Sequence, residues 1–461
     1  MKSTFAPAVA AALLTAAGVA QAQVSPYSMD SEDAIKKSAA TVAYDMMRYY
    51  HGNETGATPG ILPGPPPAGD YYWWEAGAMW GTLIEYWALT GDTTYNDNVM
   101  QAMQFQVGEN KAYMPHNFTA SLGNDDQGFW GMSAMLAAEL KFPDPPSDKP
   151  SWLGLAQAVF NTQASPDRHD DKCGGGLRWQ IPFANNGYDY KNSIANGIFF
   201  NLGARLYRYT GNTTYSDWAE KTISWMEKVG YIDAETGAVY DGAHVQKDCK
   251  DINKIEFSYN NAVLVLGCAF MYNVTEDAKW KTRIDLLLGH GLEMFFENDV
   301  AYEAACEGVT SCTTDMLSFK GYLHRWYATA TQLAPYTAEK IRPVLKKSTA
   351  AAIKQCTGGD FGRQCGFEWS KGQYIEPPGT GAGQQMNVLA ALSTQLTGHA
   401  PVTAKTGGTS KGDPNAGDGQ GNNFKDEPKP ITMADRAGAG ILTFLILGSA
   451  CGMFGWMSIG V

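Results

Sequence analysis

The segment Leu89-Thr90-Gly91-Asp92-Thr93-Thr94-Tyr95 recurs with small changes as Tyr209-Thr210-Gly211-Asn212-Thr213-Thr214-Tyr215. A weaker third copy, Tyr-Asn-Val-Thr-Glu-Asp-Ala-Lys-Trp, occupies residues 272–280. Each copy follows an apolar stretch with helical periodicity, interrupts it at Gly or Asn, and leads into a second helix, for example at residues 218–229. The recurring unit is therefore predicted to be a helical hairpin.

The first helix of each hairpin begins where a mixed polar and aromatic stretch turns apolar. Six such starts lie at 73, 125, 192, 259, 320 and 384, at steps of 52, 67, 67, 61 and 64 residues. Residues 195–204 are apolar or small on nearly every face, as in a buried helix. Six buried helices, each followed by an amphipathic partner, predict an all-α fold, an (α/α)6 barrel. The alternative is an open solenoid, but solenoid periods of about 34 to 47 residues are shorter than these steps.

Both ends of the chain resemble targeting segments. Residues 1–22 combine Lys2, an apolar run and a small-residue cleavage sequence, which predicts a secretory signal peptide. Residues 437–461 are apolar and uncharged, with no basic flank after them, which favours a glycosylphosphatidylinositol (GPI) signal over a spanning helix. Residues 401–436 are rich in Gly, Pro and polar residues and predict a flexible stalk, with lipid attachment near residues 415–423. Residues 23–400 remain for the barrel domain.

The composition narrows the class of protein. The 461-residue chain has a formal net charge of -12, which argues against a nucleic-acid partner. Asn-x-Ser/Thr sequences agree with passage through an oxidising secretory route and predict glycosylation at Asn53, Asn117, Asn212 and Asn273.

Six of the eight cysteines are candidates for disulfides. Cys451 lies in the apolar tail, and Cys268 lies in an apolar run where a free buried thiol is expected. The close pairs Cys306/Cys312 and Cys356/Cys365 suggest two local bridges and would leave Cys173 for Cys249, although six cysteines allow 15 pairings. No pair has the spacing of a zinc site, so no metal is expected.

The segment Gly123-Asn124-Asp125-Asp126-Gln127-Gly128 places two neighbouring acidic residues at a predicted helix start. One interpretation is structural, with Asn124 and Gln127 in a capping box and the aspartates as first-turn anions. The other is catalytic, because neighbouring side chains on a helix point about 100° apart and can face one cavity. Retaining glycosidases need two carboxyl groups about 5 Å apart, which vicinal aspartates can provide.

Two close anions also resist double ionisation, so one carboxyl group keeps a proton while the other stays charged. The charged group can attack and the protonated group can donate to a leaving oxygen. The helix dipole lowers both pKa values and opposes the acid role. Mutual repulsion and the apolar wall of Phe129 and Trp130 must therefore outweigh the dipole.

Side chains at the other helix starts are candidates for contacts with a sugar. Aromatic faces could stack on pyranose rings, although many large aromatics are core residues; these are Tyr71, Tyr72, Trp73, Trp74 and Trp80. Arg178 and Trp179 follow the glycine-rich turn at Cys173 and could cap the cleft or pack the turn. Other polar groups could bind hydroxyls or make interhelical bonds; these are Glu75, Asn124, Asn192, Asn196, Tyr259, Asn260, Gln384 and Gln385.

Three motifs together resemble glycoside hydrolase family 76, the endo-α-1,6-mannanase family, and in particular its fungal GPI-anchored cell-wall branch. They are Tyr72-Trp73-Trp74-Glu75-Ala76-Gly77, Gly123-Asn124-Asp125-Asp126-Gln127-Gly128 and Ser258-Tyr259-Asn260-Asn261. The resemblance covers roughly residues 25–400. It implies an (α/α)6 barrel and a cofactor-free retaining mechanism with Asp125 as nucleophile and Asp126 as acid/base.

For the fungal branch, the resemblance further implies a donor that is α-1,6-mannan or the mannose-containing glycan core of GPI anchors. The implied reaction transfers GPI-anchored mannoproteins onto wall β-glucan, with the enzyme held by its lipid anchor on the outer leaflet of the plasma membrane. Two alternatives are plain hydrolysis of mannan and non-catalytic binding of mannan in the wall.

Overall fold

The computed structural model describes residues 25–396, 398–418 and 432–459. Inner helices form a ring in which each contacts the next and the last contacts the first. They are α2 (Trp73–Thr90), α4 (Asn124–Glu139), α6 (Ser193–Thr210), α8 (Ser258–Thr275), α10 (Phe319–Leu333) and α12 (Ala382–Ser393). Each begins within two residues of its predicted start. The closed ring confirms the (α/α)6 barrel.

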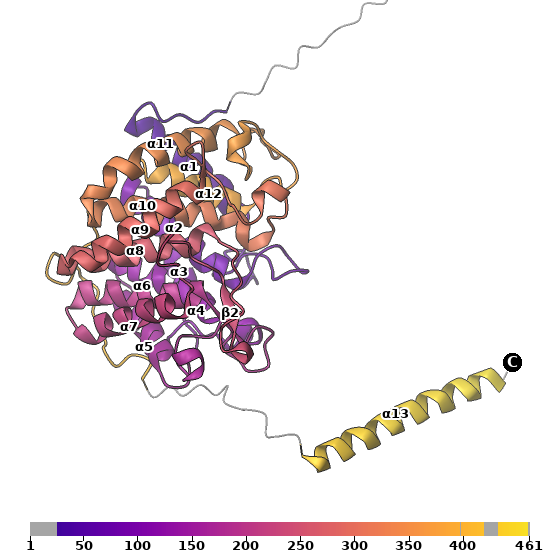
Figure 1. Ribbon diagram of the computed structural model, residues 1–461. Helices are drawn as coiled ribbons and strands as arrows, with labels where there is room; N and C mark the ends of the chain where they lie inside the picture. Colours follow the sequence, from indigo (N-terminus) through magenta and orange to yellow (C-terminus); the bar gives the residue numbers. More distant parts are fainter. Residues whose placement is uncertain (1–24, 397, 419–431, 460–461) are drawn as a thin grey trace, which may run out of the picture.

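Outer helices cover this ring, each packed against an inner one (Figure 1). They are α1 (Glu32–Met47), α3 (Asn96–Phe105), α5 (Trp152–Ala164), α7 (Thr213–Val229), α9 (Ala278–Met294) and α11 (Ala338–Lys354). The first five inner helices pair with the outer helix that follows, as predicted. The inner helix α12 differs, because its main partner is α1 from the start of the chain, with α11 packing less extensively against it. The sixth hairpin is thus completed by the N-terminal segment.

The repeated sequence marks the turn between an inner and an outer helix. Gly91 and Gly211 end α2 and α6 with φ of 80° and 78°, a left-handed conformation that glycine adopts without strain. The Asn212 side chain then accepts a hydrogen bond from the first turn of α7. In the weaker third copy, Glu276 takes the left-handed position with φ of 53°. The motif therefore encodes a C-cap followed at once by the next helix start.

Small residues let the inner helices approach one another. A Cβ atom added to Gly197 of α6 would lie 2.7 Å from Cγ1 of Val263 on α8. On α4, a Cβ atom at Gly128 would lie 2.5 Å from Cγ2 of Ile198. Both distances are too short for carbon atoms in contact, so these glycines are required by packing.

Short elements lie in the connections between the helices, most of them on the side that carries the inner-helix N-termini. Two antiparallel pairs occur, β1 (Tyr190–Asn192) with β2 (Gly242–His244) and β3 (Phe296–Glu297) with β4 (Val300–Ala301). The 3-10 turns are η1 (His116–Ser121), η2 (Lys172–Gly174), η3 (Val245–Lys247), η4 (Glu307–Val309), η5 (Thr314–Ser318), η6 (Pro335–Thr337) and η7 (Trp369–Lys371).

The three disulfides connect the cysteines in the pairing that the spacing suggested. They are Cys173–Cys249, Cys306–Cys312 and Cys356–Cys365. Cys268 is buried and free, also as expected, and Cys451 is free and exposed.

The segment of residues 401–418 differs from the flexible stalk predicted for it. Its backbone lies against the barrel, where the Val402 amide donates to the Glu139 carbonyl at 2.9 Å. The Asn161 side chain on α5 donates to the carbonyls of Pro414 and Ala416, both at 2.8 Å. The predicted boundary at residue 400 is therefore too early, because the folded domain extends through residue 418. We call residues 401–418 the C-terminal strap.

The remaining terminal predictions fall partly outside the described residues. The predicted signal peptide and most of the remaining stalk, residues 419–431, lie outside them. Helix α13 (Met433–Ile459) contains a 24-residue span, Arg436–Ile459, long and apolar enough to cross a membrane by length and composition alone. Its apolar character is consistent with the predicted GPI signal.

Candidate active site

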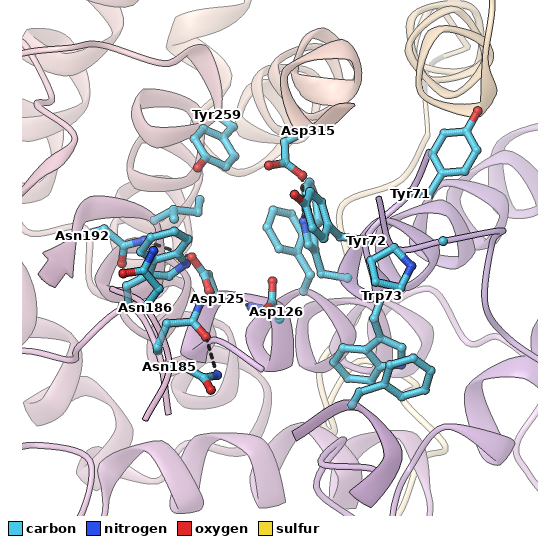
Figure 2. Close-up of a pocket in the computed structure, with 18 of the residues that line it drawn as sticks. Tyr71, Tyr72, Trp73, Asp125, Asp126, Asn185, Asn186, Asn192, Tyr259 and Asp315 are labelled. Atoms are coloured by element: carbon cyan, nitrogen blue, oxygen red, sulfur yellow. Dashed lines mark hydrogen bonds between the residues drawn. The ribbon is translucent and has the colours of Figure 1, made fainter. Parts of the chain in front are cut away.

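A cavity of about 520 Å³ opens at the N-terminal ends of the inner helices (Figure 2). Inner helices α2, α4, α6, α8 and α10 each begin at or beside its wall. Its lining residues are Ile61, Leu62, Gly64, Pro65, Tyr71, Tyr72, Trp73, Trp74, Phe118, Asp125, Asp126, Phe129, Trp179, Gln180, Asn185, Asn186, Tyr190, Asn192, Ile194, Asp241, Tyr259, Asp315 and Phe319. Four of these are carboxylates and none is Lys, Arg or His, so the wall carries uncompensated acidic groups.

Asp125 and Asp126 both line this cavity, as the helical spacing predicted, and Figure 2 shows both carboxylates at its floor. The helix cap falls one residue earlier than the structural interpretation placed it. Gly123 is the N-cap, and its amide donates to Asp126 Oδ2 at 2.7 Å. Asp126 is therefore both a capping side chain and a wall of the cavity, so the two interpretations are compatible.

Asp125 is held by two donors. The Asp126 amide donates to its Oδ1 at 3.0 Å, and Asn192 Nδ2 donates to its Oδ2 at 3.0 Å. Asn192 is itself the N-cap of α6, so the start of one inner helix orients the carboxylate on another. These bonds fix the direction in which the Asp125 oxygens face the cavity.

Burial is the main cause of the raised pKa values of Asp125 and Asp126. It raises the pKa of Asp125 to about 7, although the hydrogen bonds from Asn192 and from the Asp126 amide act in the opposite direction. Burial and then the negative charge of Asp125 raise the pKa of Asp126 well above its ordinary value. The pair therefore shares a proton near neutral pH, and the environment favours the proton on Asp126. Burial thus outweighs the lowering effect expected from the helix dipole.

A third carboxylate, Asp315, faces the pair across the cavity (Figure 2). Trp74 Nε1 donates to its Oδ1 at 3.2 Å. Burial raises the pKa of Asp315 to about 6, against the lowering effect of the Trp74 bond. Sequence reasoning missed Asp315 because it stands alone in η5, just before an inner helix. Its position directly upstream of the fifth helix start was the signal that could have identified it.

A fourth carboxylate, Asp241, was missed for a similar reason. It accepts hydrogen bonds from the Tyr190 hydroxyl at 2.8 Å and from Asn253 Nδ2 at 3.3 Å. Asp241 lies in the loop just before β2, outside every motif that the helix starts define. Gln180, Asn185 and Asn186 line the cavity from another loop that the repeat does not predict.

Most of the predicted aromatic residues meet at the cavity. Trp73 stacks against Trp130 with ring centroids 5.0 Å apart, and Trp74 packs on Phe129 at 4.4 Å. Tyr72 and Trp179 are the most solvent-accessible predicted aromatics, 38% and 39% exposed, so their rings are available to a ligand. Tyr71 also lines the cavity. Trp80 does not, because it is fully buried and donates to the Gly60 carbonyl.

Of the predicted polar residues, Asn192 and Tyr259 line the cavity. Glu75, Asn124, Arg178, Asn196, Asn260, Gln384 and Gln385 do not. Glu75 turns back to accept from the Tyr72 amide at 2.7 Å, and Asn124 donates to the Arg178 carbonyl at 2.9 Å. The expectation that Glu75, Asn124, Arg178, Asn196, Asn260 and Gln385 contact a ligand in this cavity is corrected, because the structure places them outside its lining; Gln384 lines a neighbouring cavity instead.

Other predicted polar side chains outside the lining of this cavity form hydrogen bonds with the backbone of neighbouring loops. Asn196 bonds both the amide and the carbonyl of Leu177. Gln385 donates to the Cys365 carbonyl at 3.1 Å. Asn260 is fully buried, and neither polar atom of its side chain has a hydrogen-bond partner in the described part of the chain. Amide side chains can either bind a ligand or form hydrogen bonds within the framework, so residue type alone could not show which of these each side chain does.

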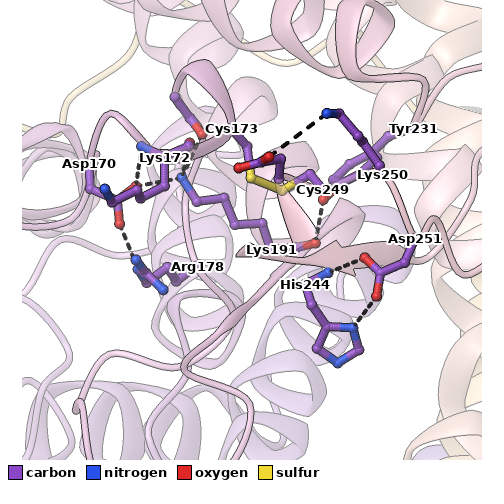
Figure 3. Close-up of a disulfide and its surroundings, with 12 residues drawn as sticks. Asp170, Lys172, Cys173, Arg178, Lys191, Tyr231, His244, Cys249, Lys250 and Asp251 are labelled. Atoms are coloured by element: carbon purple, nitrogen blue, oxygen red, sulfur yellow. Dashed lines mark hydrogen bonds and ion pairs between the residues drawn. A yellow bond between two sulfur atoms is a disulfide. The ribbon is translucent and has the colours of Figure 1, made fainter. Parts of the chain in front are cut away.

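The loop that carries Trp179 and Asn192 is fixed by a charged network beside the Cys173–Cys249 disulfide (Figure 3). Asp170 Oδ1 accepts from the buried Lys191 ammonium group at 2.7 Å, and its Oδ2 accepts from Arg178 Nε at 2.6 Å. Lys191 precedes Asn192 and Arg178 precedes Trp179, so one carboxylate anchors both neighbours of the cavity-lining residues. Arg178 therefore positions the wall rather than capping the cleft.

Comparisons with a family model, with related sequences and with solved structures all point to the same family. The sequence model of glycosyl hydrolase family 76 matches residues 34–406. The chain is 44% identical over 423 residues to the mannan endo-1,6-alpha-mannosidase DCW1 of Saccharomyces cerevisiae, covering 91% of this chain and 92% of that protein. A crystal structure of Dfg5 from Chaetomium thermophilum in complex with glucosamine matches at TM-score 0.84 and 59% identity, over 85% of this chain and 97% of that one.

A more distant match shows the shared fold alone. An inactive variant of the α-1,6-mannanase GH76A of Salegentibacter, in complex with α-1,6-mannotriose, has a TM-score of 0.63 at 15% identity, over 78% of this chain and 99% of that one. The extent of the family match and the identity to the yeast relative go further: the chain belongs to glycosyl hydrolase family 76 and is a glycoside hydrolase.

Proposed function

We propose that the protein cleaves α-mannosyl linkages with retention of configuration, using Asp125 as nucleophile and Asp126 as acid/base. The observation that carries this proposal is the presence of both carboxylates on consecutive residues of α4, in one cavity, with different hydrogen-bond partners. The yeast relative named mannan endo-1,6-alpha-mannosidase supports α-1,6-mannan as the substrate class.

The mechanism follows from the two environments. Asp125 attacks the anomeric carbon and forms a glycosyl ester, while Asp126 gives its proton to the departing glycosidic oxygen. Asp126, now an anion, then takes a proton from an incoming hydroxyl, whose oxygen displaces Asp125 and restores its carboxylate. Asn192 orients Asp125 throughout, and the Gly123 amide leaves one Asp126 oxygen to carry the proton.

We further propose that the incoming hydroxyl belongs to a sugar, so that the enzyme transfers GPI-anchored mannoproteins to β-glucan of the wall. The acidic cavity favours a donor with a protonated amine, and glucosamine, present in the Chaetomium Dfg5 complex, carries an amine. The apolar C-terminal helix supports GPI anchoring at the cell surface. Asn53, Asn117 and Asn212 are exposed, which supports their glycosylation, whereas Asn273 Nδ2 donates to the Leu333 carbonyl at 3.0 Å.

Product analysis tests transfer against the two alternatives. An α-1,6-linked mannosyl donor is incubated with the purified protein, with and without a β-glucan oligosaccharide, and the products are separated by mass. We expect a new donor–acceptor conjugate that keeps the α configuration. Free reducing mannosides alone, in both conditions, would leave hydrolysis as the activity. Binding without any product would leave a mannan-binding wall protein.

A further inference from the structure

A second cavity lies beside the catalytic one and has the same volume, about 520 Å³. Tyr71 lines both cavities. The turn η5 contributes Asp315 to the catalytic cavity and Thr314 and Leu317 to the second. Figure 2 shows Tyr71 at the edge of the catalytic cavity with its hydroxyl directed away from the catalytic carboxylates. One thin wall therefore separates the two spaces.

The lining of the second cavity suits a ligand rich in hydroxyl groups. Glu368 is only 6% exposed, lines the cavity, and has no hydrogen bond or ion pair to its carboxylate within the described residues. Its oxygens are therefore open to the cavity, where a ligand hydroxyl or water can donate to them, and the buried Lys320 ammonium group lies close enough to interact with its charge. Thr313 and Thr380 add hydroxyls, and Phe367 adds an apolar surface.

The charge of this lining selects against other ligand classes. Its charged side chains are all acidic, and none of its residues is Lys, Arg or His, so anions are repelled. No group of three or more His, Cys, Asp or Glu residues able to hold a metal ion occurs among the described residues. A polyhydroxylated molecule without negative charge suits this lining, and a glycan has both the hydroxyls and the apolar faces that the lining offers.

The walls are fixed in place before any ligand arrives. Cys312 lies in the wall and is bonded to Cys306. Glu307, also in the wall, accepts from the fully buried Lys320 ammonium group at 2.7 Å. The lining residues Phe367 and Glu368 follow Cys365, which is bonded to Cys356. A preformed site avoids the entropic cost of ordering loops on binding.

We propose that the second cavity binds a neutral glycan chain that passes over Tyr71 into the catalytic cavity. This inference rests on the proposed function, since the bound chain is one of its two reactants. A donor chain in this cavity contributes to the KM of cleavage. An acceptor chain contributes instead to the partition between transfer and hydrolysis.

Two lining variants and two matched controls test the proposal. Glu368→Gln removes the unpaired charge, and Glu376→Gln is the same change nearby, outside the lining. Thr313→Trp fills the cavity from an exposed position, and Ser311→Trp adds the same bulk two residues away, outside the lining. Binding of α-1,6-mannotriose and of a β-linked glucose oligosaccharide is measured by calorimetry in an Asp125→Asn, Asp126→Asn background, which prevents turnover.

We expect the lining variants to weaken binding of one of these glycans by about tenfold, the loss expected for a hydrogen bond to a charged group. In the active background, the lining variants should raise KM with kcat unchanged if the cavity binds the donor. If the cavity binds the acceptor, they should lower the ratio of transfer to hydrolysis with the donor KM unchanged. Lining variants that match their controls in both assays overturn the proposal. An unmodified protein that cleaves no glycoside refutes the proposed function separately, because calorimetry with the inactive background still decides whether the cavity binds a glycan.

Discussion

Two adjacent residues of the same type, Asp125 and Asp126, acquire different properties from their neighbours. Asp125 has a donor on each oxygen, which favours its charged form, whereas Asp126 receives a single backbone donor and feels the Asp125 charge. Chain position alone therefore does not assign the roles. The side chain of Asn192, 67 residues further along the chain, makes the difference.

Asparagine at either position tests this division of roles. We expect Asp126→Asn to lower kcat/KM on α-1,6-mannosyl substrates by about 10²–10⁴-fold, the usual value of general acid/base catalysis. An aryl α-mannoside, whose leaving group departs without a proton, should lose less in its first step. Asp125→Asn should lose activity on both substrates alike. Steady-state kinetics and far-ultraviolet circular dichroism check activity and fold, and full activity of Asp126→Asn on mannan would contradict the assignment.

Replacing Asp315 should change the pH dependence of kcat/KM. Its negative charge raises the pKa of both Asp125 and Asp126. In Asp315→Asn both pKa values therefore fall, so both limbs of the kcat/KM profile should move to lower pH. A role limited to contacts with the sugar would change KM without moving either limb. Profiles of kcat/KM against pH for the unmodified protein and the variant distinguish the two cases.

The buried side chain of Asp125 should also lower the stability of the folded protein near neutral pH. The pKa of Asp125 is 3.8 ordinarily and about 7 in the folded protein, so the folded state binds a proton that the unfolded state releases above pH 4. The free energy of unfolding therefore falls as pH rises through this window. Asp125→Asn should unfold at a higher temperature than the unmodified protein at pH 7.5, with the difference shrinking towards pH 4. A pH-independent difference in melting temperature would contradict this.

At the scale of elements, the inner helices supply the floor of the cavity and the loops supply its walls. The loop between α5 and α6 carries Trp179 and β1, and its shape depends on Asp170 and on the bond to Cys249 (Figure 3). Helix periodicity predicts none of this, because a loop is defined by side-chain contacts between residues that are far apart in sequence.

The disulfides should contribute unequally to stability. Cys173–Cys249 joins residues 76 apart, whereas Cys306–Cys312 joins residues 6 apart. By loop-closure entropy the first should contribute about 4 kcal/mol and the second about 2 kcal/mol to the free energy of unfolding. Serine double variants of each pair, unfolded with urea, give the comparison. Because the first bridge holds a cavity wall, its loss should also raise KM. Equal losses of stability would contradict the loop-length explanation.

At the scale of the whole molecule, the barrel could be predicted because its repeat records helix ends, and helix caps depend on local sequence. The six starts, the disulfide pairs and the pair of neighbouring aspartates that line the cavity follow from such local signals. Asp241 reaches the cavity only through tertiary contacts, so no local pattern identifies it, whereas Asp315 could have been found from its place just before the fifth helix start. The flexible stalk predicted for the strap was wrong for the opposite reason. The composition of this segment indicates a free chain, whereas its backbone forms hydrogen bonds with the barrel.

The strap gives a whole-molecule prediction. Beyond the contacts with α4 and the end of α5, Ser410 Oγ accepts from the Leu153 amide at 3.0 Å, and the Asp413 amide donates to Gln157 Oε1 at 2.6 Å. A chain ending at residue 418 should keep the thermal stability and the kcat/KM of the full barrel. A chain ending at residue 400 should lose a few kcal/mol of unfolding free energy, at about 1 kcal/mol for each hydrogen bond. Because the strap lies outside the cavity lining, kcat/KM of the shorter chain should be unchanged at temperatures where it is folded. Equal melting temperatures for the two truncations would show that the segment is the free stalk its composition suggests.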